Sequence, residues 1–142
     1  MLGRKDYTRE EVDGAQKTLT RQLTAYKKLA EAVGATGDPG AVEAMETFEP
    51  HFCEAMLMEL DRRFVHRLRG STGKDGNPLN ETELLVESLL NNDGELRTGN
   101  VVKYVPEDSV TGLEPGEAVR LDVGDVERLV EGFLADIEAK FL

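Results

Sequence analysis

Cysteine is almost absent from this chain of 142 residues, because Cys53 is the only one. A single thiol excludes an intrachain disulfide and a zinc site built from several cysteines. The first residues, MLGRKDYTREEV, contain no apolar run of the kind that a signal peptide needs. We therefore expect a protein of the reduced cytoplasm.

Long apolar runs and positive charge are also scarce. No run approaches the ~18 consecutive apolar residues of a membrane-spanning helix. The chain has 28 acidic residues against 17 basic ones, a formal net charge of −11 at pH 7. Because this charge repels polyanions at long range, we expect no general binding to nucleic acid or to an anionic membrane. It would attract a partner with a basic face, although a solvated acidic surface is the simpler interpretation.

What is present suits one globular domain spanning residues 1–142. Apolar residues make up 39% of the chain and charged residues 32%. The two kinds are interleaved, unlike the pattern of a disordered chain. A chain of this length buries roughly 70% of its unfolded surface on folding. No internal repeat or low-complexity segment divides it.

The first predicted helix spans about residues 8–33. Its apolar residues recur three or four positions apart, a spacing that places them along one side of a helix. Thr8 and Glu11 match a capping box, and Gly34 indicates where the helix stops. Such a stripe needs a partner surface. Its members are Val12, Ala15, Leu19, Leu23, Tyr26, Ala30 and Val33.

A second helical pattern covers about residues 41–69 and is interrupted by Pro50. A proline inside a helix loses one backbone hydrogen bond and clashes with the preceding turn, so we expect a kink or two abutting helices. Cys53 falls within the apolar stripe that follows, which is typical of an inert buried thiol. That stripe contains Cys53, Leu57, Leu60, Phe64 and Leu68, widened by Phe52 and Met56.

A third helix is predicted at about residues 81–91. Asn80 can cap its first turn, with Glu83 three residues later as in a capping box. Leu79 and Leu84 occupy the two positions of a hydrophobic staple. The helix then continues to the turn NNDG.

The following segment predicts β-structure. NVVKYV, residues 100–105, is rich in β-branched residues and predicts a strand. Residues 117–121 predict a second short strand after the turn residues EPG, and we expect the two to pair as a hairpin.

A last helix is predicted at about residues 123–141, capped by Asp122 with Asp125 in its first turn. Its stripe contains Val126, Leu129, Val130, Phe133, Ile137 and Phe141. The predicted fold is therefore α+β but mainly α: a bundle of about four helices with a small β-hairpin before the C-terminal helix.

The stretch HRLRGSTGKDGNPLNETELL, residues 66–85, raises the question of a phosphate-binding loop. A P-loop has two glycines separated by four residues, then lysine and a hydroxyl residue, and it follows a strand. Here Gly73 and Lys74 would need a glycine at the position of Leu68. Asp75 stands where the hydroxyl belongs, and the preceding element is a predicted helix. We interpret the stretch as a glycine-rich turn between two helices.

Candidates for metal binding are weak. Glu54 and Asp61 can share one helix face, with His51 one turn before Glu54, but this trio would need a ligand from another helix. Two solvated acids beside a core stripe are the simpler interpretation. His66 lies roughly 22 Å from His51 along a continuous helix, too far to bind the same ion. No nucleophile elbow or other catalytic arrangement is found, so we expect no catalytic residue, metal or cofactor.

Positive charge is concentrated in one segment. Arg62, Arg63, Arg67, Arg69 and Lys74 are five of the 17 basic residues. Arg63 and Arg67 are one turn apart, and arginines beside a core stripe can pair bidentately with carboxylates. Three roles stay open for this segment. They are neutralisation of acids within the bundle, a self-association seam, and a small-anion site formed by Arg63, Arg67, Arg69 and Lys74.

The central block resembles a family of small proteins from high-GC Gram-positive bacteria. The likeness lies in FEPHFCEAMLMELDRRFVHRLRG and in TGKDGNPLNETELLVESLLNNDG, and it continues through the predicted hairpin and last helix. That family carries no assigned activity. The resemblance therefore implies a bacterial cytosolic protein and supplies no functional residues.

Amphipathic helices without a catalytic arrangement favour a non-enzymatic protein-interaction module. We expect a homodimer or a complex with another protein, and neither nucleic acid nor membrane as a partner. The alternative is a protein that binds a small anionic ligand through the basic segment and the glycine-rich turn.

Overall fold

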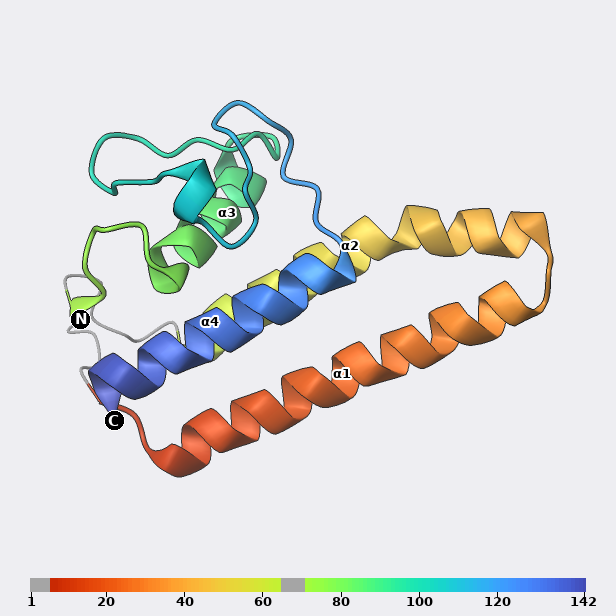
Figure 1. Cartoon of the computed structure of the whole chain (residues 1–142), viewed down its shortest axis with the longest axis horizontal. Coiled ribbons are helices and arrows are strands. Elements are labelled where there is room, and N and C mark those ends of the chain that lie inside the picture. Colours follow the sequence, from red (N-terminus) through yellow and green to blue (C-terminus); the bar gives the residue numbers. More distant parts are fainter. Residues whose placement is uncertain (1–5, 65–70) are drawn as a thin grey trace.

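The computed structural model describes residues 6–64 and 71–142. Its helices are α1 (Arg9–Ala35), α2 (Pro39–Arg63), α3 (Pro78–Asn91), the short 3₁₀ helix η2 (Pro106–Asp108) and α4 (Val123–Phe141). The first two form an antiparallel hairpin, and α4 lies along both of them (Figure 1). α3 packs on α2 and α4, and the long segment between α3 and α4 folds back over α3 (Figure 1). None of these helices is long and apolar enough to cross a membrane.

The core forms where α4 fills the trough between α1 and α2. The first five residues of the predicted α1 stripe are buried, as are all six of the α4 stripe. At the far end of α4, Phe141 stacks edge-on against Tyr7, and the carbonyl of Phe141 accepts a hydrogen bond from the Tyr7 amide at 2.7 Å. The mainly helical bundle predicted from the apolar spacing is confirmed.

Helix caps follow the sequence signals at the starts of α1 and α4. Thr8 and Glu11 form the predicted capping box, and Asp122 and Asp125 form a second one. The end of α1 differs from the prediction. Gly34 stays within the helix, which closes after Ala35 and turns at Gly37 with φ +67°.

The bounds of α2 differ from those predicted. The helix begins at Pro39, because the side chain of Asp38 caps it by accepting a hydrogen bond from the Gly40 amide at 3.0 Å. It runs without interruption through Pro50, so the alternative of two abutting helices is wrong. It ends at Arg63, and residues 65–70, which the prediction placed largely in this helix, lie outside the described residues.

The start of α3 also needs correction. Asn77, not Asn80, is the capping residue, and its side chain accepts a hydrogen bond from the Asn80 amide at 3.0 Å. Asn80 lies inside the first turn, where its side-chain oxygen accepts from the amide of Gly76 and its nitrogen donates to the carbonyl of Gly73. The cap was misplaced because either asparagine satisfies the sequence signal for a cap.

No strand forms in residues 6–64 and 71–142, so the predicted β-hairpin is wrong. In the first predicted strand, residues 100–105, the amide of Lys103 donates to the carbonyl of Lys74 at 2.8 Å, before α3. Val101 is 69% exposed and takes no part in the core.

The second predicted strand, residues 117–121, pairs elsewhere. It forms one isolated antiparallel bridge, between Glu95 and Ala118, next to the turn that ends α3. β-branched residues favour an extended backbone, but a hairpin also requires two segments in register. Here each extended segment finds a different partner, so no ladder forms.

Candidate functional site: the open groove of the arm

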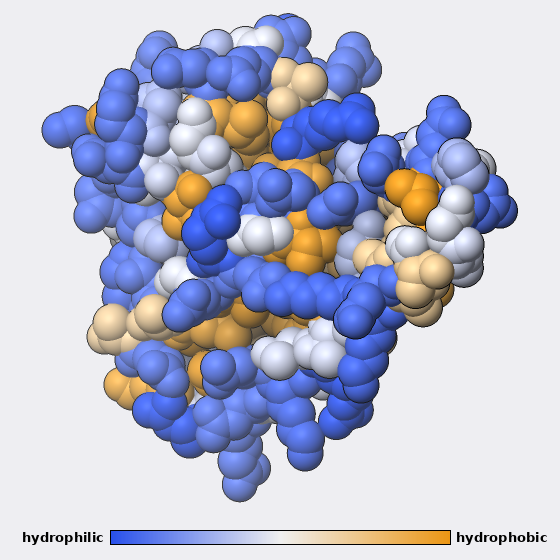
Figure 2. Space-filling model, turned by 45° about the vertical axis from the view of Figure 1, so that its right-hand side comes forward, coloured by the Kyte–Doolittle hydropathy of each residue, from blue (hydrophilic) through white to orange (hydrophobic). Residues whose placement is uncertain are grey.

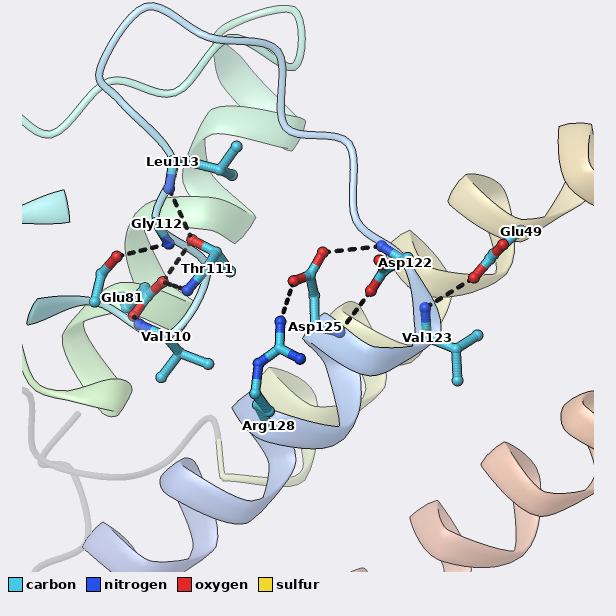
Figure 3. Close-up of polar contacts among 11 residues, drawn as sticks. Glu49, Glu81, Val110, Thr111, Gly112, Leu113, Asp122, Val123, Asp125 and Arg128 are labelled. Atoms are coloured by element: carbon cyan, nitrogen blue, oxygen red, sulfur yellow. Dashed lines mark hydrogen bonds and ion pairs between the residues drawn. The ribbon is translucent and has the colours of Figure 1, made fainter. Parts of the chain in front are cut away.

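The trough between α1 and α2 is longer than the helix that fills it. α4 starts beside the middle of α2, where the Val123 amide donates to Glu49 Oε2 at 2.9 Å (Figure 3). Past the start of α4, α1 and α2 extend toward the turn that joins them. We call this extension, residues 27–48, the arm (Figure 1). Ala30 and Val33, which continue the α1 stripe, are therefore only partly buried.

The open part of the trough is an apolar groove with a volume of about 410 Å³. Its α4 end is closed by Val123 and Gly124. Figure 2 shows that, on the face in view, apolar surface lies in recesses between rows of hydrophilic side chains. Apart from Val123, the apolar lining comes from α1 and α2: Tyr26, Ala30, Val33, Val42 and Met45.

Tyr26, which lines the groove, belongs to a group of stacked aromatic rings. The ring of Tyr26 stacks on Phe52, with centroids 4.4 Å apart and an interplanar angle of 16°. Phe48 lies 6.4 Å from Tyr26 and is 48% exposed. Leu29, on the same arm, is 52% exposed. The arm thus carries exposed large apolar side chains in addition to the apolar groove.

Acidic side chains dominate the charged rim. Glu46, Glu49 and Glu127 line the groove together with one base, Lys27. Lys27 forms an ion pair with Glu127, with Nζ 2.5 Å from Oε1. The two remaining acids of this rim come from α2, so the α2 side of the groove is its negative side.

A second recess adjoins the first and shares Glu46 and Glu49 with it. Its other charged lining residues are Arg120, Asp122 and Asp125 at the start of α4. Asp122 and Asp125 cap each other's backbone, and Asp125 also pairs with Arg128 at 2.5 Å (Figure 3). The negative rim therefore continues past the end of the groove.

Three perturbed pKa values are consistent with a negative potential here. Burial, aided by the negative charges of Glu49 and Asp122, raises the pKa of the Cys53 thiol to about 12. Burial, and to a smaller extent the negative charge of Glu49, raises the pKa of the Tyr26 phenol. Burial raises the pKa of Asp125, to which the charge of Asp122 adds, although Arg128 opposes the shift. A thiol with so high a pKa stays protonated at neutral pH, so Cys53 is not an activated nucleophile.

The predicted anion site is only half described. Arg63 lies in the last turn of α2 and is paired on its own helix with Glu59, its Nη2 2.8 Å from Oε2. Lys74 is exposed in the turn before α3. Arg67 and Arg69 lie outside the described residues.

The candidate metal ligands lie on α2, where His51 is exposed and Glu54 and Asp61 are partly buried. In the part of the chain that the structure describes, no group of three or more His, Cys, Asp or Glu side chains is placed to hold an ion.

The glycine-rich turn is tied to α3 by its own polar groups. Asn77 Nδ2 donates to the Thr72 carbonyl at 2.5 Å, and Lys140 Nζ donates to the same carbonyl at 3.0 Å. Gly73 and Gly76 both adopt positive φ, as the turn interpretation requires. Residues 71–77 thus serve as the lead into α3 and are held against α4.

Comparison with models of protein families, with curated proteins and with solved structures found no match to this chain.

The groove was missed by sequence reasoning, although one signal pointed to it. The predicted first helix is longer than the predicted last one, and the observed helices have 27 and 19 residues. At 1.5 Å per residue, α1 exceeds α4 by roughly 12 Å. The sequence does not show at which end of α1 the uncovered turns fall, because that depends on where α4 begins in space.

Proposed function

We propose that this protein is a non-enzymatic helical module that binds a partner protein through the groove of the arm. A single observation carries this proposal: the apolar trough that α4 fills over most of its length continues, uncovered, between α1 and α2. Uncovered apolar surface rimmed by polar residues is typical of protein-interaction sites. The cytoplasmic location expected from the sequence is part of the same proposal.

The shape of the groove supports a protein partner. It runs between two helices, the setting in which a helix packs its side chains into the spaces left by its neighbours. The arm also carries two exposed large apolar side chains, Phe48 and Leu29, outside the groove lining. Aromatic residues of this kind are enriched at the centres of protein interfaces.

In-cell photo-crosslinking tests the proposal. A benzophenone side chain replaces Val42 in the groove, and in a matched control it replaces Ala44, an exposed residue on the same helix. We expect the Val42 position to capture a protein that the Ala44 position does not. That protein is then identified, purified and titrated against the full chain.

Charge substitution gives the quantitative test on the purified pair. Met45→Glu introduces a carboxylate into the groove lining and should weaken binding about tenfold or more, the loss seen at central interface residues. Ala44→Glu adds the same charge outside the groove and should leave affinity within about twofold. Equal affinity of Met45→Glu and the unsubstituted protein, or equal crosslinking from both positions, would overturn the proposal. Circular dichroism checks that both variants remain folded.

Binding of a small anionic ligand stays a prediction from the sequence. Two of its four residues lie outside the described chain, and Arg63 is engaged with Glu59.

A further inference from the structure

The position of α4 indicates what kind of element the groove accepts. α4 lies in the trough between α1 and α2 and contributes an apolar side along its length. The groove continues the same trough beyond Val123 (Figure 1). A second helix placed end to end with α4 would meet the same two walls, so an α-helix is the element whose shape fits.

The length of the arm limits this helix to a few turns. From Glu49 back to Pro39, α2 spans about ten residues, or roughly 15 Å. A helix crossing that distance contributes apolar residues at i, i+3 or i+4, and i+7. Three such residues would lie over the lining formed by Ala30, Val33, Val42 and Met45.

The charges around the groove select the chemistry of its partner. The groove and the adjoining recess are lined by five acids and two bases. The acids are Glu46, Glu49, Asp122, Asp125 and Glu127, and the bases are Lys27 and Arg120. Because Lys27 pairs with Glu127 and Arg128 pairs with Asp125, the excess of negative charge lies mainly on the α2 side, at Glu46 and Glu49. Lysine or arginine on the facing edge of a bound helix would complement it, whereas acids there would be repelled.

A second copy of this chain fits the charge pattern poorly. Its net charge is −11. Its own arm carries the acids Glu31, Asp38, Glu43 and Glu46 against the bases Lys27 and Lys28. Pairing of two arms would bring like charges together, which disfavours self-recognition at this surface.

Building on the proposed function, we infer that the occupant of the groove is an amphipathic helix of another protein, with three apolar anchors and a basic edge facing Glu46 and Glu49. Its apolar residues fill the trough in line with α4. Its lysines or arginines lie over the α2 rim. The groove thus selects its partner by apolar spacing and by charge.

Two synthetic helical peptides test this inference against the full chain. Both carry apolar anchors at i, i+4 and i+7. One has lysines at the remaining positions and the other has glutamates, and binding is followed by fluorescence anisotropy at low and moderate salt. We expect the lysine peptide to bind at least tenfold more tightly, with a smaller difference at moderate salt.

Substitutions separate groove binding from simple attraction to an acidic protein. Met45→Glu makes the chain more acidic, so attraction alone would strengthen binding of the lysine peptide, whereas groove binding predicts weakening. Glu46→Lys should weaken the lysine peptide about fivefold. Glu43→Lys makes the same charge change on α2 outside the groove lining and should have little effect.

The remaining outcomes are also decisive. If the glutamate peptide binds as tightly as the lysine peptide or more tightly, the inference that the partner helix has a basic edge is overturned. Sedimentation equilibrium that shows a dimer lost on Met45→Glu assigns the groove to a second copy and overturns the inference. Failure of both peptides, with groove crosslinks still formed in cells, overturns the partner class and leaves the proposed function standing. If the groove crosslinks also fail to form, both this inference and the proposed function are overturned.

Discussion

Glu81 shows how one buried residue organises a long segment without regular structure. It lies in the first turn of α3, is 1% exposed and accepts hydrogen bonds from the Val110 amide at 2.8 Å and the Thr111 amide at 3.0 Å (Figure 3). The Thr111 hydroxyl donates to it as well, at 2.7 Å. The sequence indicates only an acid near a helix start. The fold uses that carboxylate to satisfy backbone amides that would otherwise be left without partners.

Removal of this carboxylate should destabilise the protein. Glu81→Ala leaves the Val110 and Thr111 amides without their acceptor, and we expect the free energy of unfolding to fall by about 2–4 kcal/mol. Chemical denaturation measures the change, and hydrogen exchange should show loss of protection at residues 110 and 111. Glu87→Gln, an exposed change on the same helix, should cost less than about 0.5 kcal/mol. Similar stability of the two variants would show that Glu81 does not hold this segment.

Cys53 allows a prediction about alkaline pH. Burial, together with the nearby charge of Glu49, raises the pKa of its thiol from 9.0 to about 12. Because the unfolded chain releases this proton first, the contribution of Cys53 to the free energy of unfolding is complete below pH 9.0 and is lost as the pH rises toward about 12. The difference in unfolding free energy between the unsubstituted protein and Cys53→Ala should therefore shrink over that interval. A difference that is constant with pH would mean that the thiol titrates normally in the folded state.

At the scale of elements, helices were predicted well because their signals are local. The spacing of apolar residues and two capping boxes placed α1 and α4 to within a few residues. The predicted hairpin failed because strand pairing is decided by distant segments. Lys103 hydrogen-bonds to Lys74 instead of to residues 117–121. The contact that replaces the hairpin brings residues 103–104 against Gly76, which has φ +83°.

Gly76 tests how closely these segments approach. A Cβ at this position would meet the carbonyl oxygen of Lys103 well inside van der Waals contact, in addition to the strain of a positive φ. We expect Gly76→Ala to lower the free energy of unfolding by about 3 kcal/mol or more. Gly99→Ala is the control, because Gly99 also has positive φ but open space around it, and it should cost only about 1 kcal/mol. Equal costs would mean that the contact with Lys103 imposes no constraint.

At the scale of the whole molecule, α4 fills only part of the trough between α1 and α2, and the rest of the trough is uncovered. Residues 12–26 of α1 pack under α4, whereas residues 27–48 form the arm and contribute few buried side chains. Local stability follows the density of buried contacts. The part of the molecule proposed to bind a partner is therefore also the part least supported by the core.

Hydrogen exchange can measure this difference. Amides of α1 in residues 29–35 should exchange about tenfold or more faster than those in residues 15–23, because opening the arm does not disturb the core. A bound lysine peptide should slow exchange in the arm and leave the core helices unchanged. Uniform protection along α1 would show that the arm opens only together with the whole bundle.

The sequence by itself determined the helices, the N-terminal caps of α1 and α4 and most of the residues that face the core, because apolar spacing and capping act over a few residues. It also determined the acidic charge and the single inert thiol. Tertiary structure decided the rest. The starting point of α4 beside Glu49 left the groove open, and the folding of residues 92–122 over α3 prevented a hairpin. Both depend on how distant segments meet in space, which no local pattern encodes.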